Sequence, residues 1–205
     1  MSTQEEQLTV GCYRRLFDEY GQSYKALNWG SREGQELRFK VLADIGQLAG
    51  KRILDVGCGL GDFAGWFAQN SIKVDYTGLD MTPELLAQAR KNYPALQFVS
   101  GSILDKSLLF NQKFDFVLAS GIFYTYSTSG NTWLQAAVSR MWELCEEGMA
   151  FNSLSAWAED RDPREFYADP LVTMQYCRSL TPWVTMRHDY HPRDFTMYLS
   201  RKART

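Results

Sequence analysis

The chain has 205 residues, of which 45% are hydrophobic and 22% are charged, and its formal net charge is −2. This profile favours one globular domain with a sizeable core and excludes a disordered chain. It also argues against a dedicated nucleic-acid-binding protein, which usually carries a basic excess. The 4 cysteines are widely spaced without a Cys-x-x-Cys pair, which predicts free thiols in a cytoplasmic protein. Neither a signal peptide nor an apolar run of the roughly 20 residues that span a bilayer is predicted.

The first 50 residues predict two helices separated by a loop. Residues 4–20 are compatible with a helix, although Gly11 weakens it. Residues 20–30 form an aromatic-rich loop. Ser31 can cap a second helix, which carries an apolar face and should end near Gly50.

After residue 50 the pattern alternates between strands and helices. Strands are predicted at 52–56, 73–79, 97–100, 114–119, 148–154, 183–189 and 195–199. Helices are predicted at 62–70, 83–92, 132–145 and 170–177. This order predicts an α/β fold with a doubly wound, mostly parallel sheet. The short connection at 190–194 permits only a hairpin, so the sheet should end in an antiparallel pair.

A glycine-rich turn follows the first predicted strand. Gly57, Gly59 and Gly61 allow a tight turn and a close approach of a ligand to the backbone. A dinucleotide requires the spacing GxGxxG, whereas this turn reads GxGxG and is followed by Asp62. A carboxylate there would repel a pyrophosphate but suits a cationic ligand, such as a sulfonium with an ammonium group. Asp55, just before the turn, favours the same ligand.

A second carboxylate stands at the end of the second predicted strand. Asp80 can accept hydrogen bonds from both hydroxyls of a ribose, and Met81 can pack on an adenine ring. The alternative is a plain charge at the start of the next helix. The order of strand, turn, helix, strand and acid favours the ribose.

These residues resemble the class I S-adenosylmethionine-dependent methyltransferases. The resemblance rests on the glycine-rich motif at residues 54–62, on Gly78-Leu-Asp80, and on the fourth-strand motif at 114–121, and it covers roughly residues 52–199. It implies a Rossmann-like sheet of seven strands with an antiparallel C-terminal strand. It also implies S-adenosylmethionine as cofactor and S-adenosylhomocysteine as product. The fourth strand lacks the Asn/Asp-Pro-Pro-Tyr motif of enzymes that methylate DNA bases or glutamine, which favours a small-molecule acceptor.

The resemblance also implies cofactor contacts at the ends of the strands. These contacts are Asp55, Gly57, Cys58, Gly59, Asp80, Met81, Ser102, Ile103 and Ser120. The family usually has an acidic residue after the third strand, where it bonds the adenine amino group. Here the sequence reads Gly101-Ser102-Ile103, so a serine hydroxyl or Asp105 would have to serve.

In this family the N-terminal segment often covers the cofactor. We therefore expect residues 1–50 to form a helical lid and residues 51–205 to form the cofactor-binding domain. Arg38 or Tyr24 could hold the methionine carboxylate, and aromatic faces such as that of Trp29 would attract a sulfonium. Ordinary packing aromatics and a surface arginine are the alternative.

The acceptor side of the site is less well defined. His188 and His191, the only two histidines, lie near acids and could supply a general base, or they could be hairpin residues at the sheet edge. They do not make a convincing metal site. Loop aromatics could line an acceptor pocket or anchor loops: Phe123, Tyr124, Tyr126, Trp157 and Tyr167.

The sequence therefore predicts transfer of a methyl group from S-adenosylmethionine to nitrogen or oxygen of a small molecule. Positioning, water exclusion and proton removal suffice for such a reaction, so no catalytic triad is needed. Alternatives are other chemistry with the same cofactor on this fold, a nicotinamide oxidoreductase, and a non-catalytic partner protein that binds the cofactor. The sequence gives no indication of oligomeric state.

Overall fold

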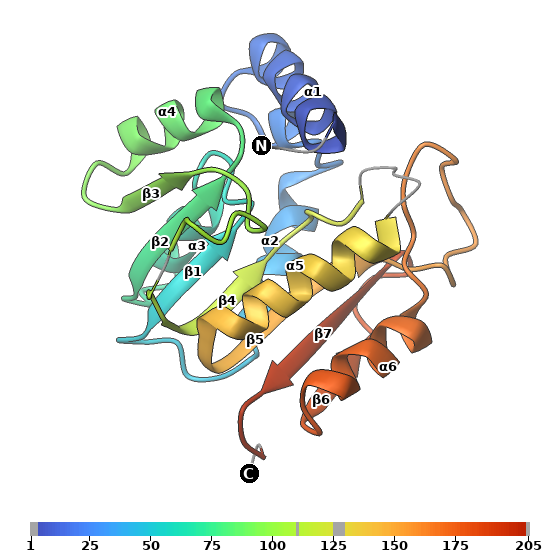
Figure 1. Cartoon of the computed structure of the whole chain (residues 1–205). Coiled ribbons are helices and arrows are strands. Elements are labelled where there is room, and N and C mark those ends of the chain that lie inside the picture. Colours follow the sequence, from blue (N-terminus) through green and yellow to red (C-terminus); the bar gives the residue numbers. More distant parts are fainter. Residues whose placement is uncertain (1–3, 110, 125–129, 204–205) are drawn as a thin grey trace.

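A computed structural model describes residues 4–109, 111–124 and 130–203. These residues contain one mixed sheet of seven strands in the order β3-β2-β1-β4-β5-β7-β6 (Figure 1). The strands are β1 (Arg52–Val56), β2 (Asp75–Asp80), β3 (Gln97–Ser100), β4 (Phe114–Ala119), β5 (Cys145–Leu154), β6 (Val184–Arg187) and β7 (Asp194–Ser200). β1 to β5 pair in parallel, whereas β7 runs antiparallel between β5 and β6. The predicted fold class is confirmed.

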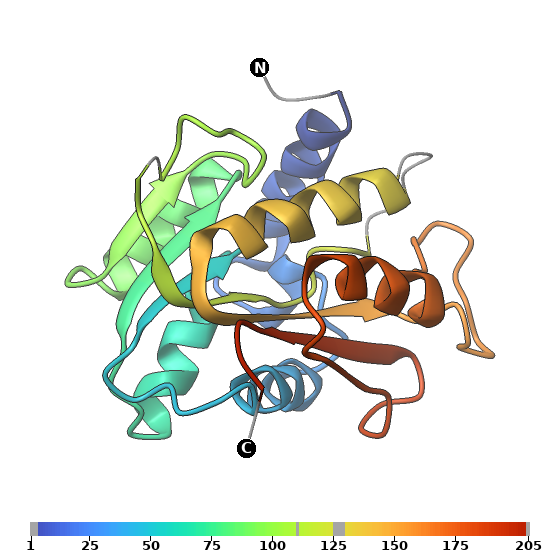
Figure 2. The same cartoon turned by 60° about the horizontal axis from the view of Figure 1, so that its bottom comes forward.

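The helices cover both faces of this sheet. They are α1 (Gln4–Tyr20), α2 (Arg32–Ala43), α3 (Asp62–Gln69), α4 (Pro83–Asn92), α5 (Gly130–Leu144) and α6 (Pro170–Leu180), with a short 3-10 helix η1 (Tyr24–Leu27). Figure 2 shows α5 and α6 on one side of the sheet and α2 on the other. The layers therefore follow the doubly wound arrangement, in which parallel strands are buried on both faces.

The strand residues alternate between two cores, as the period of a strand requires. In β4, Phe116 and Leu118 pack against α2 and α3, whereas Val117 and Ala119 pack against α5. Tyr198 of β7 donates a hydrogen bond of 2.6 Å to the Val41 carbonyl, which fastens α2 to the sheet. Because α2 shares its core with the sheet, any lid within residues 1–50 is restricted to α1, η1 and the loops around them.

Most predicted boundaries agree with the structure to within a few residues, and the main difference is the end of α2. We expected this helix to continue to about Gly50, but it ends at Ala43. Its last turn tightens, since the N–H groups of Asp44 and Ile45 bond to carbonyls three residues back. The apolar side chains of Ile45 and Leu48 remain buried after the helix has ended, so the apolar pattern outlasts the helix.

The carboxyl ends of the parallel strands carry the features that matter for function. α1 lies beyond these ends, beside α4 and over the turn after β1, and far from the end of β7 (Figure 1). Ligands of doubly wound sheets bind at this edge. Among the residues that the structure describes, no helix is both long enough and apolar enough to cross a bilayer.

Candidate active site

The glycine-rich turn between β1 and α3 forms one wall of a cavity of about 240 Å³. Gly57, Gly59 and Gly61 have φ angles of +75°, +53° and +81°, which favour glycine. A Cβ at Gly57 would overlap the Ile122 side chain, and one at Gly59 would lie 2.7 Å from Cδ2 of Leu27. Gly57 and Gly59 line the cavity, and the side chains of Leu27 and Ile122, which also line it, can lie against them only because both positions lack a side chain.

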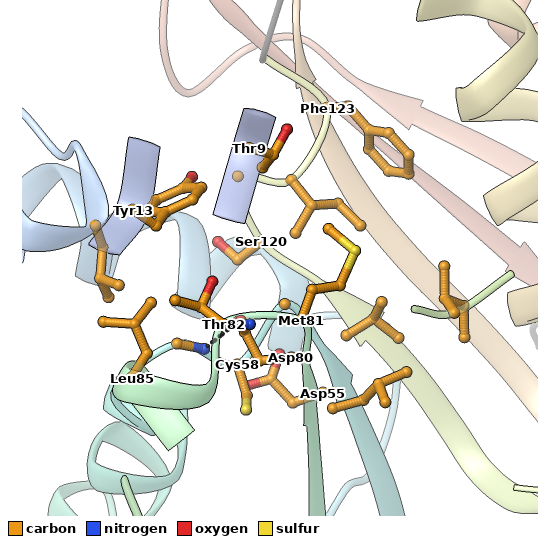
Figure 3. A pocket seen from close by; sticks show the side chains of 18 of the residues that line it. Thr9, Tyr13, Asp55, Cys58, Asp80, Met81, Thr82, Leu85, Ser120 and Phe123 are labelled. Atoms are coloured by element: carbon orange, nitrogen blue, oxygen red, sulfur yellow. Dashed lines mark hydrogen bonds between the residues drawn. The ribbon is translucent and has the colours of Figure 1, made fainter. Parts of the chain in front are cut away.

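Asp80 closes the next side of this cavity. Its Oδ2 accepts the N–H of Gly59 at 2.9 Å, and its Oδ1 accepts the N–H of Thr82 at 2.8 Å. Burial raises the pKa of this carboxyl, while the backbone hydrogen bonds oppose that rise. Since each carboxylate oxygen can accept a further hydrogen bond, Asp80 can hold two neighbouring hydroxyls of a ligand. Figure 3 shows Asp80 and Met81 on the cavity wall, together with Thr9 and Tyr13 of α1.

Asp55 is the most deeply buried carboxyl on this lining. Only 2% of its surface is exposed, and the Tyr76 hydroxyl donates to its Oδ2 at 2.6 Å. Burial raises the pKa of Asp55 to about 7, although the bond from Tyr76 opposes the rise. Such a group can ionise when a cation enters, and so matches a ligand with an ammonium or sulfonium charge. Asp62, at the start of α3, also lines the cavity and is held by Gln35 at 3.0 Å.

The far end of the cavity is bounded by the loop after β3. Ser102 and Ile103 line it, and Met81 lies on the same lining. Asp105, the alternative candidate, bonds the backbone and hydroxyl of Ser107 and is not part of the lining. A carboxylate comes here from an unexpected element, because Glu6 of α1 accepts the Ser102 hydroxyl at 2.5 Å.

α1 is tied across the cavity at further points along its length. Tyr124 donates its hydroxyl to that of Tyr13 at 2.9 Å, and Arg14 pairs with Glu84 of α4 at 2.6 Å. Burial raises the pKa of Tyr13 well above its ordinary value, so this phenol stays protonated. The N-terminal helix therefore bridges the loop after β4 and α4.

A second cavity, of about 290 Å³, adjoins the first. Both are lined by Leu27, Trp29, Gly121 and Phe123, which form the wall between them. The second lining is more polar and takes residues from the ends of β5 and β7 and from the loops around them. These include Tyr124, Asn152, Glu165, His191, Arg193 and Asp194. Asn152 also accepts the Gly121 N–H at 2.8 Å and so orders the turn after β4.

A histidine and a carboxylate form a dyad on the second cavity. Nδ1 of His191 lies 2.7 Å from Oδ2 of Asp194. A carboxylate only accepts, so this contact places a proton on Nδ1 and leaves the Nε2 lone pair free to take one. The Arg193 N–H also points to Nδ1, at 3.2 Å, and would need this nitrogen as an acceptor; the shorter contact with Asp194 favours the tautomer with the proton on Nδ1. Burial lowers the pKa of His191, although Asp194 opposes the shift, which favours a neutral imidazole.

Arg38 lies on the second cavity and not on the first. It forms a buried ion pair with Asp194, and it donates to the Gly34 carbonyl at 2.6 Å. Its guanidinium lies 5.1 Å from the centre of the Trp29 ring. The predicted contact of Arg38 with a methionine carboxylate gains no support from this position, and Tyr24 lines neither cavity.

The structure separates the remaining predicted residues. Asp55, Gly57, Cys58, Gly59, Asp80, Met81, Ser102, Ile103, Ser120 and Trp29 share the first cavity. Phe123, like Trp29, lines both cavities, Tyr124 lines the second, and Tyr167 lines neither but accepts a hydrogen bond from Arg193. His188 bonds to Ser155 at 2.7 Å and faces Trp157, outside both linings. Tyr126 lies outside the described residues.

Sequence reasoning missed several residues of the two linings. Glu6, Gln35 and Phe39 come from the predicted lid segment, in which only aromatics and one arginine were considered. Asn152 and Arg193 line the second cavity. Asn152 is a buried polar residue within an apolar strand, and that signal could have identified it.

Within residues 4–109, 111–124 and 130–203, no group of three or more His, Cys, Asp or Glu side chains is placed to hold a metal ion. A doubly wound sheet with a glycine-rich turn after β1 and a carboxylate at the end of β2 defines a Rossmann-like protein that binds an adenosine-containing cofactor.

Comparison with known proteins makes this class specific. A family model for a methyltransferase domain matches residues 53–148. A Mycobacterium tuberculosis protein, "Putative methyltransferase Rv1506c", is 30% identical over 161 residues, which cover 74% of this chain and 93% of that protein. The chain thus belongs to the class I S-adenosylmethionine-dependent methyltransferases, its cofactor is S-adenosylmethionine, and the predicted enzyme class is confirmed.

Further matches agree with this family. The demethylmenaquinone methyltransferase of Chlorobaculum tepidum is 41% identical over 95 residues, covering 43% of this chain and 38% of that enzyme. The fold resembles a crystal structure of the magnesium protoporphyrin IX methyltransferase of Synechocystis PCC 6803 with bound S-adenosylmethionine. That likeness has a TM-score of 0.69 at 14% identity and covers 97% of this chain and 99% of the other.

Proposed function

We propose that the enzyme transfers the methyl group of S-adenosylmethionine to a nitrogen or oxygen atom of a small-molecule acceptor bound in the second cavity. The observation that carries this proposal is the polar second cavity, which shares the wall of Trp29 and Gly121 with the first and carries the His191–Asp194 dyad. A methyl donor in one cavity and an acceptor in the other would meet at this wall.

For the cofactor, we assign the first cavity by its chemistry. Gly57 and Gly59 would lie along the methionine part, with Asp55 facing its ammonium charge. Asp80 would accept both ribose hydroxyls, and Met81 would pack on the adenine. The carbonyl of Ser120, at the end of β4, would accept from the ammonium group. The fit is supported by Gly57 and Gly59 on the lining and by the carboxyls of Asp55 and Asp80 on the same lining.

The second cavity favours a polar acceptor without a large net charge. Arg38 pairs with Asp194, and Arg193 pairs with Glu165 at 2.6 Å, so the two cations of the lining are balanced by two carboxylates. Nε of Arg193 is buried and has no hydrogen-bond partner among the described residues. This donor could anchor an oxygen or nitrogen atom of the acceptor, since buried donors are rarely left unpaired.

The cofactor supplies an electrophilic methyl group on a sulfonium. In the transfer, the acceptor atom forms a bond to the methyl carbon, the carbon–sulfur bond breaks, and its electron pair returns to sulfur. The acceptor loses a proton, which Nε2 of His191 would take and pass to solvent. Asp194 would hold the imidazole in the required tautomer. His188 lies outside both cavities, so we assign the base to His191.

The proposal is tested by incubating the protein with S-adenosylmethionine and panels of phenols, amines and carboxylic acids. S-adenosylhomocysteine release is measured, and products are identified by mass spectrometry. We expect a product with one methyl added at nitrogen or oxygen. For an O–H or protonated N–H acceptor, His191→Gln should lower kcat by about 10²- to 10⁴-fold, the usual contribution of a general base, with little change in the KM for the cofactor.

The pH profile separates a base from a structural histidine. Only the neutral imidazole can take a proton, and its pKa is lowered by burial. The rate should therefore rise with pH and level off, with a midpoint below the ordinary histidine value of about 6.5. His188→Gln is the matched control, and its rate should still rise with pH in the same way. The assignment of His191 as general base is wrong if His191→Gln retains both the rate and its rise with pH.

We also propose that α1 and the segment up to Gly30 act as a lid, and that the enzyme works in the cytoplasm. The contacts of Tyr13, Arg14 and Glu6 across the first cavity support the lid. The cytoplasmic location is supported by the 4 cysteines, which are all free thiols, Cys58, Cys145 and Cys177 being buried.

A further inference from the structure

The adenine end of the first cavity lacks the acidic residue that the family usually places after the third strand. Ser102 and Ile103 occupy that loop, and Asp105 turns away to bond Ser107. The carboxylate that reaches this end comes from α1 instead. Glu6 lies on the cavity lining and bonds Ser102 across 96 positions of the sequence.

We propose that Glu6 of the N-terminal helix reads the adenine of the cofactor by accepting a hydrogen bond from its 6-amino group. Ser102 is then a positioning residue, which holds the carboxylate of Glu6 in place. This inference rests on the placement of ribose and adenine proposed above, but it does not depend on the methyl acceptor or on the general base His191.

The burial of Glu6 supports a role in binding. Glu6 is 5% exposed, and it is the buried residue within the described part of α1, whereas the apolar Leu8 two positions later is 68% exposed. Burying a carboxylate is costly unless hydrogen bonds compensate. A helix selected only to cover a cavity would turn an apolar residue inward at this position.

The geometry around Ser102 sets the direction of the hydrogen bonds. The Ser102 Oγ accepts the N–H of Leu104 at 3.2 Å, and its proton points to Oε1 of Glu6 at 2.5 Å. An ionised carboxylate has about four acceptor sites, so the carboxylate of Glu6 can accept hydrogen bonds besides the one from Ser102. Met81 and Ile103 supply the apolar lining beside it. The arrangement suits a flat ring that carries a donor group at its edge.

In this arrangement the closed position of α1 would depend on which purine the cofactor carries. The adenine 6-amino group donates a hydrogen bond, whereas hypoxanthine presents a carbonyl oxygen at the same position. A carboxylate and a carbonyl repel each other, so the deaminated cofactor would oppose the closed position of α1. Two other contacts of α1, that of Arg14 with Glu84 and that of Tyr13 with Tyr124, do not involve the purine.

The test is binding of S-adenosylhomocysteine against S-inosylhomocysteine, measured by isothermal titration. We expect the unmodified protein to prefer the adenine ligand at least tenfold. In Glu6→Gln this preference should fall at least fivefold, because the amide can rotate to donate to the carbonyl of the inosine ligand. Ser102→Ala should lower the preference by a smaller factor, since it removes only the support of the carboxylate.

Two control variants separate base reading from lid closure. Glu5→Gln alters the neighbouring carboxylate, which also lines the cavity and is more exposed, and Arg14→Ala cuts the tie to α4. Both should change the affinity for the two ligands by the same factor. The proposal is overturned if Glu6→Gln weakens both ligands equally, or if Glu5→Gln is the variant that shifts the preference. A misplaced ribose would instead appear as unchanged affinity in Asp80→Ala.

Discussion

Replacing Asp80 by alanine should weaken S-adenosylhomocysteine binding about a hundredfold. In the proposed arrangement this carboxylate accepts two ribose hydroxyls while it holds the N–H groups of Gly59 and Thr82. Hydrogen bonds to charged groups contribute about 1.5–3 kcal/mol each. Two such bonds at the lower limit give about 3 kcal/mol, and each 1.4 kcal/mol is a factor of ten in affinity.

The same substitution also has a cost in the unliganded protein. The N–H groups of Gly59 and Thr82 lose their acceptor, and leaving buried donors unsatisfied costs about 1–3 kcal/mol. Part of that cost is recovered because the buried carboxylate, whose pKa is raised by desolvation, is removed. A modest fall in Tm is therefore expected, and all titrations must be run well below it. Asp80→Asn is a poorer probe, since its amide would turn a donor toward one of these N–H groups.

Changing the ligand instead of the protein separates the ribose contact from the loss of protein stability. S-adenosylhomocysteine and its 2′-deoxyribose analogue are titrated against the unmodified protein and against Asp80→Ala. If Asp80 holds the 2′-hydroxyl, the analogue should bind the unmodified protein more weakly, and that penalty should vanish in the variant. Asp105→Ala is the matched control, because this carboxylate follows β3 but lies outside the cavity. Unchanged affinity in Asp80→Ala, or fully additive losses, would refute the ribose assignment.

Two further predictions concern the charge of the first cavity and its cover. Burial holds the pKa of Asp55 at about 7, and a cationic ligand requires the ionised form, so affinity for S-adenosylhomocysteine should fall as the pH drops below 7. Titrations in buffers of different ionisation enthalpy should detect the release of a proton on binding near pH 7. Asp55→Asn should abolish this proton release. An affinity that does not change with pH would contradict the role of Asp55. Deleting the residues before Gly30 removes α1, Leu27 and Trp29 and should weaken binding by about tenfold or more, measured by the same titration. Intact binding by the shortened protein would mean that the segment is no lid.

Local patterns in the sequence predicted the strands and most helices closely. Residues 52–56, 83–92, 97–100 and 114–119 have the predicted bounds, because each run is bordered by turn or capping residues such as Gly57 and Thr82. The glycine motif likewise predicted the turn after β1, where three glycines adopt positive φ angles. α2 is the exception, since the apolar side chains of Ile45 and Leu48 pack on the sheet without helical structure.

The contacts that complete the two cavities could not be predicted in this way. Glu6 meets Ser102 from 96 positions away, and Arg38 meets Asp194 from 156 positions away. Neither pair shares an element, a spacing or a motif, and only the folded chain brings them together. The sequence therefore located an arginine and a histidine near the site but could not tell that Arg38 and His191 share one carboxylate.

That shared carboxylate connects the N-terminal segment to the second cavity. Trp29 rests on Gly121, whose φ of +69° and missing side chain let the ring approach the turn after β4; a Cβ there would lie 2.7 Å from Cζ2 of the ring. Arg38 lies against the same ring and is held by Asp194, which also holds His191. We infer that Asp194, at the start of β7, holds Arg38 beside Trp29 in the wall between the two cavities. The same carboxylate holds His191, the proposed general base, on the far side of this wall. A loop that carries Trp29 could not move without disturbing this arrangement, so closing the site over the cofactor would also prepare the acceptor side for reaction.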